Sequence, residues 1–344
     1  MNRDLGRETA LHDVLIRHED LNKARQLLER EFGFLRYATF NADNPSIEVM
    51  SGHGVRIWLA RQNADVSLHP EFKLSVPPAQ PSLVFQKRMA DKDSDSHEGR
   101  VKEMLYRDLI PGRQGNRFIA SHIKVSKDEP VKDSVHFHRI RFQMIYCWKG
   151  SVRVVYEDEG PEFVMQEGDS VLQPPEIRHK VVECSPDGAE VIEFCCPASH
   201  WTFYDHDLQL PNSTEKHPHE YSGQRFIHHK GREARWRSWR GEGFESRDLG
   251  MKDASGGVGL ANVVRRCDGM QPAHFRHNGE ILFMFLLNGA LTLRCETQRL
   301  EQFQEGHSIV IPREMRYAIV ESSPDLEFLE VALPGDLEIG SVLE

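Results

Sequence analysis

The sequence predicts a mainly β protein in which two tandem β-barrels follow a small N-terminal α+β domain. An internal repeat predicts this class, because a repeated segment folds into a repeated unit. Turn residues also predict it, since Gly, Pro and Asp separate short apolar runs in both copies, as in antiparallel β-structure. The matching segments are Tyr106–Leu109 and Ser246–Leu249, Gly150 and Gly289, and Pro174–His179 and Pro312–Tyr317.

Apolar runs of strand length occur at corresponding places in the two copies. The runs of the first copy are Phe142–Tyr146, Val152–Tyr156 and Val191–Phe194. The runs of the second copy are Ile281–Leu287, Leu291–Cys295 and Phe328–Val331. We therefore expect equivalent strands in the two barrels.

Residues 1–62 have a different pattern, which predicts a β-α-β-β-β domain. A first strand covers 11–17, and Asp20 can cap a helix that Gly33 ends. Segments 34–40, 46–50 and 55–59 then read as three strands. The expected organisation is thus 1–62 as this domain, 63–104 as a linker, 105–204 as barrel one, 205–240 as a second linker and 241–337 as barrel two.

Composition narrows the functional classes for this chain of 344 residues. Its formal net charge of −10 argues against nucleic acid as a partner, since phosphate binding needs a basic face. With a mean hydropathy of −0.53 and no long apolar run, no membrane span is expected. The N-terminus lacks the apolar core of a signal peptide, so the cytoplasm is the expected location, with the six cysteines reduced.

A basic stretch between Arg225 and Arg247 interleaves arginine with Trp236 and Trp239. Such a stretch can clamp an anion or stack a nucleobase. We favour a structural role, in which the tryptophans cover a barrel and the arginines meet carboxylates of this acidic chain.

Four neutral donors in barrel one predict a metal site. His136 and His138 lie at i and i+2 of an expected strand, so their side chains share one face. Gln143 follows on the next apolar run, and His179 follows a glycine and a proline. Three imidazoles and one amide inside a barrel can hold a divalent metal.

This pattern resembles the two signature motifs of the cupin superfamily. The first motif has two histidines one residue apart, a carboxylate and then a glycine; His136, His138 and Gly150 match it, with Gln143 at the carboxylate position. The second motif matches at Gly168, Pro174 and His179. Pro130, Glu176 and Glu183 depart from the usual residues. The resemblance implies a bicupin, with two jelly-roll barrels.

The second barrel has lost the ligand set. The repeat places Phe275 at the position of His136 and His277 at that of His138. It places Leu282 at the position of Gln143 and Tyr317 at that of His179. Because one donor is too few for a metal, we expect a filled, structural barrel.

The surroundings of the expected site can also be read from strand alternation. Ile145 and Cys147 should face inward with Gln143, so the wall near the metal is expected to be apolar. Glu183 and Glu193 are weak candidates for a general base. The residues expected to face outward are Phe142, Tyr146 and Trp148.

The family resemblance implies a non-haem metal-dependent dioxygenase that acts on an aromatic or enolisable small molecule. Fe(II) is the expected cofactor, while Mn, Ni, Zn and Cu also suit the donors. The alternatives are a non-catalytic ligand-binding or regulatory bicupin and a redox-neutral metal-dependent isomerase or cyclase. One fold hosts many chemistries, so the catalytic and substrate-binding residues stay unassigned.

The N-terminal segment is similar to half of a vicinal-oxygen-chelate, or glyoxalase-like, module. Such a half-module lacks its partner sheet, and outward-facing tryptophans such as Trp148, Trp236 and Trp239 make the barrel surfaces apolar. Both features predict a homo-oligomer.

Overall fold

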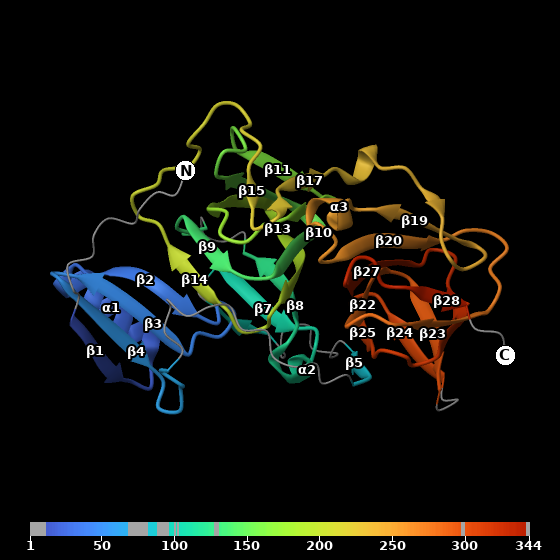
Figure 1. The fold of residues 1–344 in the computed structure, drawn as a ribbon, viewed down its shortest axis with the longest axis horizontal. Coiled ribbons are helices and arrows are strands. Elements are labelled where there is room, and N and C mark those ends of the chain that lie inside the picture. Colours follow the sequence, from blue (N-terminus) through green and yellow to red (C-terminus); the bar gives the residue numbers. More distant parts are fainter. Residues whose placement is uncertain are drawn as a thin grey trace.

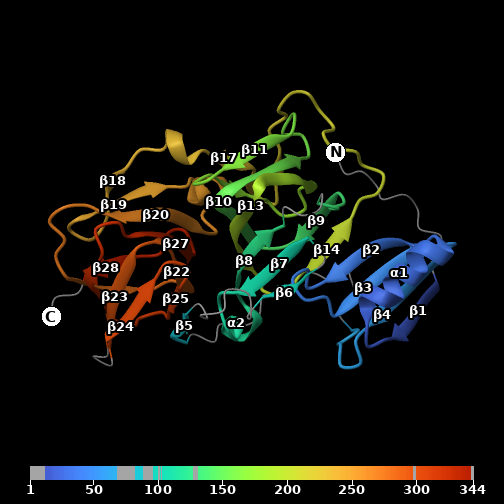
Figure 2. The same cartoon turned by 180° about the vertical axis from the view of Figure 1, so that it is seen from behind.

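Three parts follow one another along the long axis of the molecule, with a jelly roll in the middle (Figures 1 and 2). The computed structural model describes residues 12–67, 82–87, 96–99, 101, 103–126, 131–296 and 300–341. None of the helices in these ranges is long and apolar enough to cross a membrane. Pro130 and most of the first expected linker lie outside the described residues.

The N-terminal module, residues 12–67, has the predicted β-α-β-β-β order. The Asp20 side chain caps helix α1 by accepting a hydrogen bond from the Lys23 amide at 3.0 Å, and Gly33 ends the helix with a φ of 67°. The helix packs on the sheet through Leu21 and Leu28. The elements are β1 His12–Arg17, α1 Leu21–Phe32, β2 Leu35–Phe40, β3 Ile47–Gly52 and β4 Val55–Ala60.

The sheet of this module continues into the first jelly roll. Strand β2 pairs antiparallel with β14, Trp201–Tyr204, so Trp201 lies opposite Phe40. Trp201 and Phe203 are buried against the module's apolar core. The β2 edge of the module's sheet is therefore paired within the chain.

The first jelly roll spans Met104–Tyr204. Strands β10 and β13 are long, and β13 pairs with β8 near its end and with β9 at its start, so these strands join the facing sheets. The sheets do not close into a barrel. The elements are β7 Met104–Asp108, α2 Arg113–Asn116, β8 Ile119–Val125, β9 His136–Arg139, β10 Phe142–Tyr156, β11 Phe163–Gln166, β12 Ser170–Leu172, β13 His179–Cys196 and β14 Trp201–Tyr204.

The second jelly roll spans Phe244–Ser341 and repeats this design with two separate facing sheets around an apolar core. Its glycine at 289 repeats Gly150, and both have a φ near 72°, which favours glycine. The elements are β19 Phe244–Asp248, α3 Met251–Ala254, β20 Leu260–Arg266, β21 Ala273–His277, β22 Ile281–Asn288, β23 Ala290–Cys295, β24 Leu300–Gln304, β25 Ser308–Ile311, β26 Tyr317–Ser322, β27 Glu327–Leu333 and β28 Ile339–Ser341.

The two segments expected to be linkers exchange strands between the jelly rolls. Strand β5 precedes the first jelly roll but pairs with β25 of the second. Strand β17 precedes the second jelly roll but pairs with β12 of the first. The elements of these segments are β5 Val84–Gln86, β6 His97–Glu98, β15 Glu220–Tyr221, β16 Gln224–Arg225, β17 Ile227–His229, η1 Gly231–Glu233 and β18 Arg237–Ser238. The exchange ties the two jelly rolls together.

An apolar interface lies between the jelly rolls. The outward faces of β10 and β22 contribute Phe142, Tyr146 and Phe285 to one buried cluster. Trp148 belongs to it and is only 4% exposed, with its indole N–H donating to the Leu287 carbonyl at 3.0 Å. The predicted outward direction is confirmed, but the covering surface is the second jelly roll, so Trp148 gives no reason to expect a second copy.

Self-association stays a prediction; Trp148 no longer supports it, while Trp236 and Trp239 are partly exposed. The exposed apolar side chains of the N-terminal module now offer the main surface for it, among them Leu15, Leu27 and Phe32. Light scattering at micromolar concentration tests it, and a monomer would contradict it.

Candidate metal centre

Three histidines converge inside the first jelly roll. His136 and His138 point to the same side of β9, and His179, the first residue of β13, is the cross-strand neighbour of His136. Each is at most 7% exposed. One nitrogen from each ring lies within 4.8 Å of the others. The structure thus brings together the three imidazoles that the motif spacing predicts.

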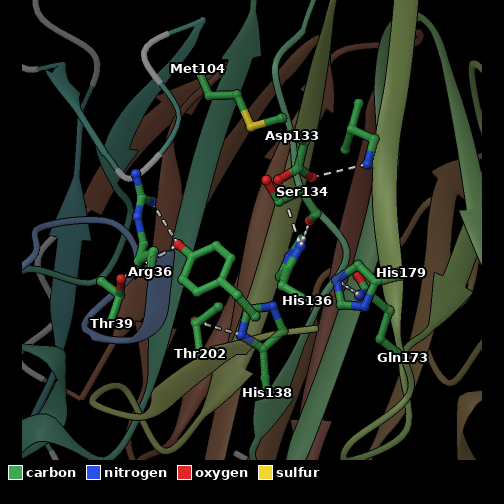
Figure 3. Close-up of polar contacts among 12 residues, drawn as sticks. Arg36, Thr39, Met104, Asp133, Ser134, His136, His138, Gln173, His179 and Thr202 are labelled. Atoms are coloured by element: carbon green, nitrogen blue, oxygen red, sulfur yellow. Dashed lines mark hydrogen bonds and ion pairs between the residues drawn. The ribbon is translucent and has the colours of Figure 1, made fainter. Parts of the chain in front are cut away.

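Main-chain carbonyls fix the tautomers of two of these histidines, and the contact of His136 with Ser134 is drawn in Figure 3. Nδ1 of His136 lies 2.8 Å from the Ser134 oxygen, and Nδ1 of His179 lies 3.0 Å from the Ile177 oxygen. A carbonyl oxygen only accepts, so both Nδ1 atoms carry the proton. In both rings Nε2 therefore holds the lone pair that a metal ion would bind.

Polar groups behind the rings hold their orientation. The Asp133 carboxylate approaches His136 Nδ1 at 3.6 Å and accepts the Val181 amide at 3.0 Å. The Thr202 hydroxyl lies 2.9 Å from His138 Nδ1. Such partners orient metal-binding imidazoles and strengthen them as ligands.

Gln143 faces the same interior from β10, as predicted, and is 2% exposed. Its Nε2 donates to Glu193 Oε1 at 2.8 Å. Glu193 lines the cavity beside the histidines, whereas Glu183 is 58% exposed and paired with Arg153. Of the two carboxylates considered as a base, only Glu193 lies at the site.

Gln173, which the sequence did not single out, is a second amide at the site. It is fully buried, and its Nε2 lies 2.7 Å from His179 Nε2. Its Oε1 accepts no hydrogen bond from any described residue. The sequence signal for it was a glutamine directly before the motif proline, Pro174.

A cavity of about 80 Å³ adjoins the histidines. Its wall is mostly apolar and includes the predicted inward residue Ile145 together with Val154 and Met165. Its polar lining residues are Asp43, His136, His138, Gln143, Gln173, His179, Lys180, Glu193 and His200. A space of this size holds only a few atoms of a ligand, since pockets for drug-sized ligands measure about 300–1,000 Å³.

The N-terminal module supplies part of this wall. The loop between β2 and β3 places Asp43 at the cavity, and an ion pair of 2.5 Å with Arg113 holds it there. Beside it lies His200, whose ring centroid is 5.3 Å from that of His138. Burial lowers the pKa of His200, so this ring is neutral near pH 7. Asp43 was not predicted because its contact depends on how two domains meet, and His200 was not predicted because it lies in a loop outside the two motifs.

The nearby thiol and phenol stay protonated. Burial, reinforced by Glu193, raises the pKa of Cys195 well above its usual value. Burial likewise raises the pKa of Tyr156, whose ring stacks on His179 at 5.4 Å between centroids. Neither group is therefore an anionic ligand or nucleophile at neutral pH.

The corresponding interior of the second jelly roll is filled. Phe275, Leu282 and Tyr317 are buried in its core, as predicted. Arg240 reaches in from the connecting segment, forms an ion pair with the fully buried Glu330 and donates to the Tyr317 hydroxyl at 3.1 Å. His277 Nε2 lies 2.9 Å from the Ile311 oxygen.

The donors in the first jelly roll fit a divalent ion. Bonds of about 2.1 Å place neighbouring ligand atoms roughly 3.0–3.4 Å apart, so the three nitrogens need only a small contraction. All three imidazoles have a hydrogen-bond partner at Nδ1. Within the described residues, these three histidines are the group of His, Cys and acidic side chains whose ligand atoms all lie within 4.8 Å of one another.

Comparisons with solved structures identify the fold. Salicylate 1,2-dioxygenase from Pseudoaminobacter salicylatoxidans, in complex with gentisate, matches 81% of this chain and 90% of its own, with a TM-score of 0.57 and 14% identity. Oxalate decarboxylase from Bacillus subtilis, a protein with Mn(II) centres, matches 79% of this chain and 81% of its own, with a TM-score of 0.53 and 16% identity.

These matches support the predicted jelly-roll bicupin fold. No protein-family model and no curated protein sequence matches the chain. The resemblance of the N-terminal module to a glyoxalase-like half-module is not confirmed by the comparisons and stays an expectation.

Proposed function

We propose that the chain is a metal-dependent bicupin dioxygenase that acts on an aromatic or enolisable small molecule. The observation that carries this proposal is the group of three buried imidazoles beside a small, mostly apolar cavity. His136, His138 and His179 would hold one divalent ion, with Gln143 as the fourth ligand that the motif predicts.

The charge of this donor set bears on the substrate class. Neutral ligands leave a divalent ion its full charge, which favours a bidentate anionic ligand such as an enolate or catecholate. When bound, the ion would polarise an oxygen atom of the substrate and, if it is redox-active, would permit reaction with dioxygen. Fe(II) suits this chemistry and these donors, and Mn, Ni, Zn or Cu would also bind.

The chain's own residues would orient the substrate. The apolar wall excludes water from the cavity, and Ile145 and Val154 contact whatever occupies it. Glu193 is the carboxylate placed to accept a proton from a bound acid, and the amide of Gln143 fixes its position. Salicylate 1,2-dioxygenase, whose solved structure holds gentisate, supports an aromatic substrate for this fold.

A redox-neutral reaction is the second candidate, and the position of Glu193 favours it. A carboxylate beside a Lewis-acid site can move a proton without any oxidant, as an isomerase, cyclase or decarboxylase requires. Oxalate decarboxylase shares the fold.

Metal analysis of the natively expressed protein, followed by oxygen-electrode assays, separates these functions. A dioxygenase consumes oxygen with an aromatic or enolisable compound and is inactive under nitrogen. Turnover that persists under nitrogen supports the redox-neutral reaction. A protein that contains no metal after native expression and binds none on reconstitution would contradict both.

A further inference from the structure

The amide of Gln173 lies where a ligand of the proposed ion would lie. Its Nε2 is 2.7 Å from Nε2 of His179, the nitrogen that holds the lone pair. Two ligand atoms at right angles around an ion with bonds of about 2.1 Å are about 3.0 Å apart. The end of the Gln173 side chain is therefore already at the distance of a neighbouring ligand (Figure 3).

The tautomer of His179 determines whether the NH2 group or the oxygen of the Gln173 amide faces its Nε2. Because Nδ1 of His179 donates to Ile177, its Nε2 can only accept, and Gln173 must turn its NH2 group toward it. The carbonyl oxygen then points elsewhere and accepts no hydrogen bond from the described residues. A fully buried acceptor without a partner costs free energy.

An ion on Nε2 of His179 would remove the acceptor that this NH2 group uses. Rotation of the terminal amide by half a turn exchanges its nitrogen and oxygen without moving the rest of the side chain. The oxygen would then face the cation, and an amide oxygen is a suitable ligand for Fe(II) or Mn(II). The same rotation would give Oε1 of Gln173 the cation as its partner.

We propose that Gln173 supplies an oxygen ligand to the ion held by the three histidines. This inference rests on the proposed metal site and adds a ligand that the cupin motif positions do not include. Gln143, at the usual motif position, already donates its amide to Glu193, so its orientation serves that carboxylate. Gln173 would be an amide ligand in addition to Gln143, and we expect Gln143 to contribute less because Glu193 also holds its amide.

Metal affinity, measured by competition with a chelator, tests this inference on the full chain. Gln173→Leu should weaken Mn(II) or Co(II) binding by about 10–100-fold, the range known for groups that support metal ligands, or more. Gln143→Leu, the matched control on the neighbouring strand, should weaken binding less. Equal affinity of Gln173→Leu and the unsubstituted protein would overturn the inference, whereas a protein that never binds metal would overturn the metal site itself.

Gln173→Glu gives an outcome of opposite sign for the two roles. As a ligand, the carboxylate should tighten binding and change the visible spectrum of the Co(II) form. As a mere hydrogen-bond partner, a carboxylate could not donate to His179 and would favour protonation of its Nε2, so binding would weaken. Thermal unfolding of the metal-free proteins controls for folding, and weaker binding by a folded Gln173→Glu protein would overturn the inference.

Discussion

The two jelly rolls share one backbone design but have opposite interiors. In the first, His179 lies across from His136, and in the second Tyr317 lies across from Phe275 at the same place in the pairing. The first interior combines imidazoles, amides and a cavity, while the second is packed with apolar rings around one buried ion pair. The strand scaffold therefore does not require a site, and a few inward side chains decide whether one forms.

The ion pair in the second jelly roll explains how its interior stays closed. Arg240 occupies the space beside Tyr317, and its guanidinium stacks on Trp239 with 3.9 Å between its carbon and the ring centroid. Coulombic and hydrogen-bond contacts with Glu330 and Tyr317 outweigh burial and raise the Arg240 pKa. Glu330 is thereby paired with a cation of the chain itself rather than left to bind a divalent cation.

The largest contrast expected is in metal content. His138→Ala removes one of three imidazoles and should abolish stoichiometric metal binding, because two histidines hold a divalent ion weakly. His277→Ala, its counterpart in the second jelly roll, should leave the metal content unchanged. Elemental analysis after equilibration with one equivalent of metal measures both. Metal lost from the His277 variant alone, or two ions per chain, would overturn the assignment.

The histidine triad could be predicted from strand alternation together with the motif resemblance. Alternation places His136 and His138 on one face, and the resemblance to the second cupin motif adds His179. The same alternation correctly separates Ile145, which lines the cavity, from Tyr146, which faces the second jelly roll. Periodicity thus determines which side chains face the interior.

Contacts between distant segments could not be predicted in this way. Asp43 reaches the cavity only because β2 extends the sheet through β14, and Arg240 fills the second interior from a segment expected to be a linker. Nothing local to these residues reveals their partners.

Glu176 departs from the motif in another way. It adopts a φ of 66° at a turn where the motif usually has glycine, and Glu314 repeats this strain in the second copy.

The next largest effect should follow from breaking the buried ion pair of the second jelly roll. Arg240→Met leaves the carboxylate of Glu330 buried without its cation, and we expect a loss of about 3–5 kcal/mol in the free energy of unfolding. The double variant Arg240→Met with Glu330→Met removes both charges and should recover much of this loss. Urea unfolding measures all three proteins.

An exposed ion pair on the same jelly roll provides the control. Arg276 and Glu314 are each about half exposed at 3.4 Å, so Arg276→Met should cost less than about 1 kcal/mol. If Arg240→Met costs no more than Arg276→Met, the buried pair does not stabilise the second interior.

A smaller effect is expected at the junction between the jelly rolls. Burial would raise the pKa of Glu280, but hydrogen bonds and charges from Arg141 and Arg117 outweigh it and lower the pKa to about 2. A folded-state pKa below the unfolded value stabilises the protein above about pH 4.3, and this stability is lost as the pH falls toward 2. Glu280→Gln should therefore lower the free energy of unfolding by up to about 3 kcal/mol at pH 7.

The pH dependence and a second ion pair check this assignment. The difference between Glu280→Gln and the unsubstituted protein should shrink by about half or more by pH 3. Glu305, which meets Lys149 across the same junction with both side chains about 40% exposed, gives the matched variant Glu305→Gln, with an expected effect below about 1 kcal/mol. A pH-independent difference for Glu280→Gln would show that its charge is not the cause.

The smallest effect concerns Gln143, whose position in the second jelly roll is taken by Leu282. Gln143→Glu adds the carboxylate that is usual in the cupin motif and should tighten binding of a hard divalent ion while weakening that of an anionic substrate. Glu193 limits the gain, because its oxygen lies 2.8 Å from the amide that would be replaced, and two carboxylates at that distance share a proton. We expect a gain of about tenfold at most, largest at alkaline pH.

Exchanging the two residues removes this limit. The double variant Gln143→Glu with Glu193→Gln restores the hydrogen bond with its roles reversed, and it should bind metal more tightly than either single variant. Leu282→Glu should gain no metal, since His277 is the one imidazole at the three corresponding histidine positions and apolar side chains fill the second interior. Chelator competition measures the metal affinity of the two single variants, the double variant and Leu282→Glu against that of the unsubstituted protein. If Gln143→Glu and the double variant both bind metal with the affinity of the unsubstituted protein, position 143 does not contact the ion, and the difference between the two jelly rolls rests on the histidines alone.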